Sequence, residues 1–496
     1  MHDRGKSDSP VVPAKLANKS ARAAAESVEG RGLPEGNTAS STRPGRSAGL
    51  GAPNGLDRVR EVARADKDAR FTALLHHVDF NRLRAAYAAI RRSAAPGVDG
   101  VTWQSYGQNL EANLQDLHAR LHAGRYRAKP SRRSYIPKAD GRLRPLGIAT
   151  LEDKIVQRAV VEVLGAVYEQ DFAGFSYGFR PGRSQHQALD ALAVGIGRKK
   201  VNWVLDADIR EFFTSLDHQW LRKFLEHRLA DKRVLRLIDK WLAAGVIEDG
   251  TWTSEDQGTP QGASVSPLLA NVYLHYVLDL WVKWWRGHQA HGDVIIVRWA
   301  DDFIMGFEHE KDARQFLTDL RARFAKFGLE LHPDKTRLIE FGRHAARHRA
   351  ARGQGKPETF PFLGFTHMCG KSRKGGFWLR RITIGKRMQA KLRQIKDQLK
   401  RRRHQPIPVQ GAWLASVVRG HLAYYAVPGN TDAVAAFRTQ VTRHWFKALR
   451  RRSQRTRINW TRMNRLATRW PPPARVMHPF PSERFDAITR GRSPVR

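Results

Sequence analysis

The 496-residue chain has one cysteine, Cys369, and no apolar run near the ~20 residues that span a bilayer. A single cysteine excludes an internal disulfide and any zinc site built from several cysteines. The N-terminal residues are polar and lack the apolar core of a secretory signal. We therefore expect a cytoplasmic protein that makes no use of a membrane.

Acidic residues are also scarce, with 47 Asp and Glu against 87 Lys and Arg, a formal net charge of +40. The imbalance is concentrated, because residues 381–496 contain 27 basic and 4 acidic residues. Generic solubility charge would be spread more evenly. A basic region of this density predicts a nucleic-acid partner whose binding weakens steeply with salt.

The few carboxylates include one conspicuous pair, Asp301 and Asp302, between the apolar runs 294–297 and 303–307. This pattern predicts two strands around a short turn. A solvated hairpin turn is the ordinary explanation for an Asp-Asp pair. However, a second apolar run, 203–213, contains Asp206 and Asp208, which share one strand face. Three carboxylates from different strands are what two Mg²⁺ ions need for nucleotidyl transfer, although spacing alone does not choose between Asp206 and Asp208.

These strands resemble motifs of reverse transcriptases. Trp299-Ala-Asp-Asp302 is similar to their Tyr-Ala-Asp-Asp box, and Ala207-Asp-Ile-Arg-Glu-Phe-Phe213 is similar to their first palm motif, which selects Asp208. Further boxes follow in the family's order over about 270 residues, at 135–148, 175–184, 258–271, 328–336 and 362–365. The set resembles the bacterial group II intron branch, the intron-encoded reverse transcriptase and maturase, and 95–100 resembles that branch's N-terminal block.

The resemblance implies an RNA-directed DNA polymerase that binds group II intron RNA, assists its splicing and copies it into DNA during retrohoming. Its partners would be the intron RNA, an RNA template, a DNA primer or target, and dNTPs. It also implies two Mg²⁺ ions, with Mn²⁺ as a possible substitute, held by Asp208, Asp301, Asp302 and the Ile209 carbonyl. Lys335 recurs in a family box, but a solvated lysine at a helix end explains it equally well.

Other roles are implied by motif position. Arg132 and Lys138 would grip the incoming triphosphate, Phe213 would exclude a 2′-hydroxyl, and Gln261 would contact the incoming nucleotide. Trp299 would pack near the primer. The basic run that follows the last predicted helix would bind nucleic acid through Arg450, Arg451, Arg452, Arg455 and Arg457.

Several positions depart from the family pattern. Trp299 replaces the usual Tyr, Thr214 replaces the usual Asp, and Ala263-Ser-Val265 replaces the commoner Gly-Val-Ile. None of these removes a predicted metal ligand. The zinc-containing endonuclease that many intron-encoded members carry does not fit a chain with one cysteine, so we expect an endonuclease-lacking protein.

The predicted fold is α+β, a right-hand polymerase with an antiparallel palm sheet and a helical thumb. We expect a disordered basic tail (1–55), a helical N-terminal extension (56–125), fingers (126–200) that contain a basic hairpin and a helix over about 151–168, and a palm (201–378). Three basic amphipathic helices would form the thumb, or maturase domain X (379–450), with Thr431 as a helix cap, followed by a nucleic-acid-binding segment (451–496).

Two other functions stay open at this point. One is a maturase whose polymerase is inactive, which the complete carboxylate set argues against. The other is a reverse transcriptase in host use, in defence or beside an adaptive immune system, which the basic C-terminal region argues against. The sequence does not fix the oligomeric state.

Overall fold

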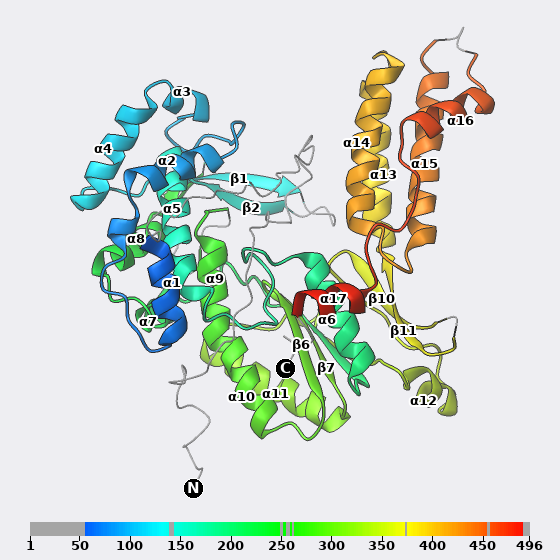
Figure 1. Cartoon of the computed structure of the whole chain (residues 1–496), viewed down its shortest axis with the longest axis horizontal. Coiled ribbons are helices and arrows are strands. Elements are labelled where there is room, and N and C mark those ends of the chain that lie inside the picture. The colour runs from blue at the N-terminus through cyan, green and yellow to red at the C-terminus, as the bar shows by residue number, and fades with distance from the viewer. Residues whose placement is uncertain are drawn as a thin grey trace.

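The computed structural model describes residues 55–137, 143–248, 251–253, 258–259, 262–372, 374–453 and 457–489. It is a mixed α+β structure, as predicted, with helices on one side, a sheet in the middle and a helical bundle beyond it (Figure 1). Within these ranges, no helix is long and apolar enough to cross a membrane.

The first part is helical and contains α1 (Gly55–Ala65), η1 (Leu75–His77), α2 (Phe80–Ala89), α3 (Trp103–Gly107) and α4 (Leu110–His122). Local signals explain the helix starts. Asp79 caps α2, and Thr102 with Ser105 forms a capping box on α3. This part packs on α5 (Leu151–Tyr168), whose observed bounds match the helix predicted there.

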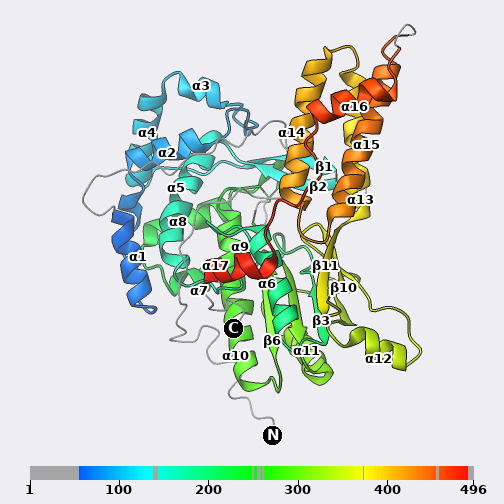
Figure 2. The same cartoon turned by 45° about the vertical axis from the view of Figure 1, so that its right-hand side comes forward.

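The predicted basic hairpin is confirmed as β1 (Ser131–Pro137) paired antiparallel with β2 (Leu143–Ile148). Two short strands, β4 (Val246–Glu248) and β5 (Thr251–Thr253), extend it to a sheet of order β2-β1-β4-β5. Figures 1 and 2 show the hairpin reaching from the helical side toward the bundle.

The central antiparallel sheet has the order β6-β7-β3-β8, from β3 (Trp203–Ala207), β6 (Val294–Trp299), β7 (Asp302–Phe307) and β8 (Arg337–Glu340). Alternate residues along β6 enter different cores: Val294 and Ile296 join one, Ile295 and Val297 the other. The first core includes α11 (Glu310–Lys326) and the second includes α6 (Gln185–Arg198). The sheet is therefore covered on both faces, which explains why the first four residues of β6, 294–297, are all apolar.

Five further helices support this sheet and the helical part. They are α7 (His218–Glu226), α8 (Lys232–Leu242), α9 (Ser266–Leu274), the π-helical turn η2 (His275–Asp279) and α10 (Leu280–His288). After β8 come α12 (Ala345–Ala351) and a third sheet of order β11-β10-β9, from β9 (Phe360–Phe362), β10 (Phe365–Lys371) and β11 (Phe377–Thr383).

The three predicted amphipathic helices are present as α13 (Gly385–Arg401), α14 (Ile407–Tyr425) and α15 (Thr431–Arg450), which share one apolar core. The predicted cap is wrong: Thr431 is the first helical residue, and Asn430 holds the cap position without a side-chain cap bond. Asn430 instead donates to the Thr383 hydroxyl and accepts from its backbone NH, tying the bundle to β11.

The chain then returns from α16 (Trp460–Arg469) along the bundle to the central sheet, where α17 (Pro481–Thr489) packs on α6 (Figures 1 and 2). Asp190, in the middle of α6, pairs with Arg381 at 2.9 Å and with Arg484 at 2.5 Å. Trp470 packs against Gly411, so this aromatic of the basic C-terminal region serves the bundle core.

Candidate active site

The three predicted carboxylates lie at one end of the central sheet. β6 and β7 are paired up to Trp299 and Asp302, so Asp301 lies in the tight turn between them. Ala207, the last residue of β3, pairs with Phe303 of β7, and Asp208 follows directly. Strand register therefore brings together residues about 90 positions apart in sequence.

The electrostatics show that these carboxylates act on one another. Burial, followed by the nearby Asp208, raises the pKa of Asp301 to about 6. Burial and the charges of Asp301 and Asp208 raise the pKa of Asp302 well above its usual value. Because Asp302 keeps an exposed surface, we give repulsion between carboxylates more weight than burial. The site has more negative charge than its protein surroundings neutralise.

Lysine provides the nearest counter-charge. The Lys335 ammonium forms an ion pair with the Asp208 carboxylate, and Lys335 also lowers the pKa of both Asp301 and Asp302. The Asp208 carbonyl accepts a hydrogen bond from the His332 backbone NH at 2.8 Å, which holds the two segments together. The role left open for Lys335 by the sequence is thus a charge partner of the carboxylates.

Asp206 lies on the same strand but in another environment. It pairs with Arg337 of β8 at 3.5 Å, and burial raises its pKa to about 6. The charge of Asp208 is among the main causes of the raised pKa of both Asp301 and Asp302, and that of Asp206 is not. The geometry therefore favours Asp208 as the third carboxylate.

Within the described ranges, no group of three His, Cys, Asp or Glu side chains is arranged to hold a metal ion. At Asp208 the Lys335 ammonium supplies the positive charge instead. The donor set still fits a hard divalent cation, because clustered carboxylates with raised pKa values are relieved by such a charge. Ile209, predicted to contribute its carbonyl, is anchored by a buried side chain and a β-bridge to Leu331.

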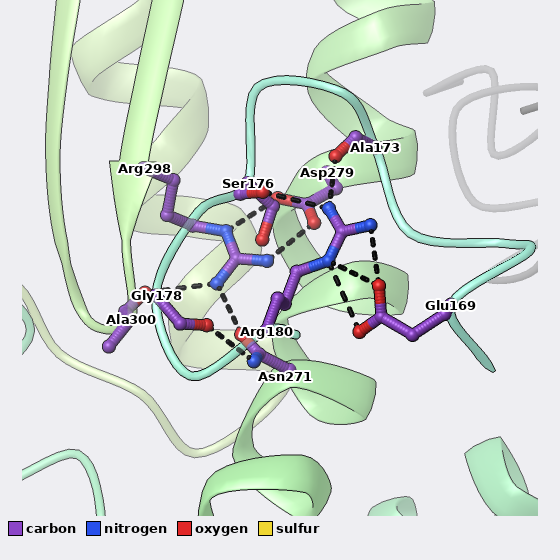
Figure 3. A network of polar contacts seen from close by, with 9 residues as sticks. All are labelled: Glu169, Ala173, Ser176, Gly178, Arg180, Asn271, Asp279, Arg298 and Ala300. Atoms are coloured by element: carbon purple, nitrogen blue, oxygen red, sulfur yellow. Dashed lines mark hydrogen bonds and ion pairs between the residues drawn. The ribbon is translucent and has the colours of Figure 1, made fainter. Parts of the chain in front are cut away.

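A buried ion pair supports the turn that carries Asp301 (Figure 3). Arg298, fully buried on β6, donates to both carboxylate oxygens of Asp279 in η2 at 2.7 and 2.6 Å. It also donates to Asn271 at 3.1 Å and to the Ala300 carbonyl at 3.0 Å. Ala300 has a φ of +55°, which costs energy in a residue with a Cβ. Arg298 therefore fixes the strained residue next to Asp301.

The loop before α6 presses on the same turn from the other side. The Asn271 amide donates to the Gly178 carbonyl at 2.8 Å, and a Cβ at Gly178 would lie 2.3 Å from the Ala300 nitrogen. Arg180 holds this loop by pairing with Glu169 at 3.0 Å and donating to two loop carbonyls (Figure 3). The motif at 175–184 is thus a support for the carboxylate turn, which sequence reasoning did not identify.

Phe213 is partly buried and packs against the core that contains α11, and its ring meets Phe179 edge-on at 6.3 Å. Arg132 is exposed and donates to the Pro96 carbonyl at 2.9 Å. Arg144 on β2, which we did not single out, is close enough to lower the pKa of Asp301. Lys138 and Gln261 lie outside the described residues.

Trp299 is partly buried against the core that contains α6. At the far end of α15, Arg450 and Arg451 are exposed, and Arg452 donates to the His404 carbonyl at 2.9 Å. Arg457 is exposed, and Arg455 lies outside the described residues. These roles in nucleic-acid binding stay predictions.

The candidate site lies in a part of the chain that is similar to known proteins. Residues 136–367 match the family "Reverse transcriptase (RNA-dependent DNA polymerase)". The chain is 38% identical over 220 residues to Protein YkfC of Escherichia coli K12, covering 43% of this chain and 58% of that protein. It is 34% identical over 241 residues to the group II intron-encoded protein LtrA of Lactococcus lactis, covering 47% of this chain and 39% of LtrA. The chain thus spans less than two thirds of each relative.

Proposed function

We propose that the chain is an RNA-directed DNA polymerase and intron maturase, because residues 136–367 match the reverse transcriptase family and the chain is similar to a group II intron-encoded protein. The observation that carries the proposal is the convergence of Asp208, Asp301 and Asp302 at one sheet end, with raised pKa values at the last two. Structural carboxylates would be neutralised by their neighbours. These are arranged to receive additional positive charge.

In this proposal the central sheet is the palm, the β1–β2 hairpin belongs to the fingers, and α13, α14 and α15 form the thumb or domain X. Asp208, Asp301 and Asp302 would hold two Mg²⁺ ions, which would activate the primer 3′-hydroxyl and neutralise the leaving pyrophosphate. Lys335, which pairs with Asp208, would exchange its partner when a cation binds.

The chain's own residues would then position the substrates. Phe213, partly exposed beside the carboxylates' strand, would pack under the sugar of the incoming dNTP. Arg132 would leave the Pro96 carbonyl to contact the triphosphate, as a guanidinium binds phosphate with two parallel donors. The basic helices would hold intron RNA in its splicing-competent fold, so that splicing chemistry belongs to the RNA.

The test is extension of oligo(dT) on poly(rA) with dTTP and Mg²⁺, comparing wild type, Asp301→Ala and the control Asp116→Ala. Asp116 is an exposed carboxylate on α4 that pairs with Arg120. We expect synthesis by wild type and the control only, and equal binding of the intron RNA by all three.

Three results would contradict the proposal in different ways. Synthesis by Asp301→Ala would show that the carboxylates are not catalytic. Absence of synthesis by every protein, with tight RNA binding, would favour a maturase without polymerase activity. Absence of intron catalytic RNA in the flanking DNA would favour a host-recruited enzyme.

A further inference from the structure

The sheet end opposite the carboxylates carries a basic insert, residues 341–359, which joins β8 to β9 and contains α12. Trp203, at the start of β3, pairs with Glu340 at the end of β8, whereas Asp208 follows the other end of β3. At about 3.3 Å per residue, this places the insert roughly 17 Å along the strand from Asp208. Figures 1 and 2 both show α12 at the margin of the molecule, remote from α13, α14 and α15.

Three segments are fastened together at Gly342, where the insert begins. Gly342 has a φ of +143°, and a Cβ there would lie 2.0 Å from the Val201 carbonyl oxygen. The Cys369 thiol of β10 donates to the Gly342 carbonyl at 3.6 Å, and Arg343 donates to the Gly197 carbonyl at the end of α6 at 3.0 Å. The insert is therefore anchored to the sheet, and β10 contacts its first residues through Cys369.

The cations of the insert and of the β10–β11 turn form what we call the far-edge surface: Arg343, Arg347, Arg349, Lys356, Lys371 and Lys374. All are exposed except Arg349, which is partly exposed. The insert contains one acidic residue, Glu358, and the neighbouring Glu340 is engaged by Arg352 and His348. The surface thus keeps a strong positive charge that no described core or carboxylate site uses.

The composition of this surface indicates how it would recognise a partner. Clustered Lys and Arg bind phosphates without regard to sequence. Residues 341–359 contain no Trp or Tyr, and their Phe341 is buried. Their two exposed rings, His344 and His348, stack on each other, and His348 also pairs with Glu340. The insert therefore offers no exposed Trp, Tyr or Phe ring on which unpaired bases could stack. Phosphates presented without exposed bases are those of a double helix.

We propose that the far-edge surface binds the phosphate backbone of a double-stranded nucleic acid, at a site separate from the carboxylates. This goes beyond the proposed function and does not depend on polymerase activity. A structured RNA, in its helical parts, and a duplex DNA target share this chemistry.

The test uses the full chain and the triple variant Arg347→Gln/Lys356→Gln/Lys374→Gln. The matched control, Arg58→Gln/Lys232→Gln/Arg236→Gln, removes three exposed cations from α1 and α8. Binding of a blunt RNA duplex of about 20 base pairs is measured over a range of salt concentrations, with a DNA duplex and a single-stranded RNA as further arms.

For the far-edge variant, we expect the negative slope of log affinity against log salt to be smaller in magnitude by about 3. We also expect this variant to bind the duplex at least about tenfold more weakly than wild type at 0.1 M salt. The control should retain the wild-type slope, and all proteins should extend a short primer–template equally. The duplex arm that shows the loss identifies the source of the phosphates. Equal duplex binding by variant and control would overturn the proposal, as would an equal loss with single-stranded RNA. Failure of primer extension in every protein would bear only on the proposed function.

Discussion

The buried Arg298–Asp279 pair is expected to be a main support of both stability and activity. Both side chains have no exposed surface, and Asp279 accepts two hydrogen bonds from the guanidinium. Asp279→Ala would leave a fully buried charge without its partner, which costs about 3–5 kcal/mol. For a cooperative unit of about 200 residues this lowers the unfolding temperature by roughly 6–20 °C.

The assay is chemical denaturation followed by primer extension, and the chain provides a control. Arg222 and Asp239 form an ion pair on the surface, so Asp239→Ala should cost less than about 1 kcal/mol. The double variant Arg298→Met/Asp279→Leu removes both buried charges and should recover most of the lost stability. It should not recover activity, because the Ala300 carbonyl still lacks its donor.

This separation of stability from activity makes the reasoning refutable. Equal denaturation midpoints for Asp279→Ala and Asp239→Ala would show that the buried pair contributes no more than a surface pair. A fully active double variant would show that the hydrogen bond to Ala300 does not position Asp301.

Three further predictions follow from the same geometry. Because the pKa of Asp301 is raised, its ionisation destabilises the folded protein increasingly as pH rises from 3.8 to about 6, and the cost persists at higher pH. In EDTA, Asp301→Asn should therefore have a higher melting temperature than wild type at pH 7.5 but not near pH 4. Mg²⁺ should raise the melting temperature of wild type more than that of Asp301→Asn. Gly178→Ala should reduce primer extension at least about tenfold without preventing folding, because its Cβ would strike Ala300; wild-type rates would refute the contact. Asp190→Asn should expose α17 to limited proteolysis, whereas Asp486→Asn at the exposed pair with Arg198 should have a smaller effect, and equal cleavage would count against Asp190 as the anchor.

The local pattern of apolar and turn residues was sufficient to predict the helices and strands that carry the site. The apolar runs around Asp301 and Asp302 are short and bounded by turn residues, so the β6–β7 hairpin follows from sequence alone. The helix of α5 and the three helices of the bundle likewise follow from the spacing of their apolar residues. Thr431 shows the limit, since either Asn430 or Thr431 could precede the helix by residue type.

The supports of the site could not be predicted in this way. Arg298 lies in an apolar strand, where a charged residue is expected at the surface, and its partner Asp279 is 19 positions away on a helix whose π-turn no residue preference signals. The link between Asp208 and Lys335 spans 127 positions and depends on the register of β3 with its neighbours. Long-range pairing decides these contacts.

The site is locally unfavourable, and its supporting contacts offset that cost. Asp301, Asp302 and Asp208 place like charges together, and Ala300 adopts a φ that costs energy, so local chemistry here is unfavourable by itself. Such a conflict can persist only if other contacts compensate for it. Arg298 does so from within the core, by a hydrogen bond to the strained residue and an ion pair that fixes its own position. The carboxylates can therefore be identified from the sequence because their grouping is unfavourable. The contacts that compensate for this cost can be identified only from the folded structure.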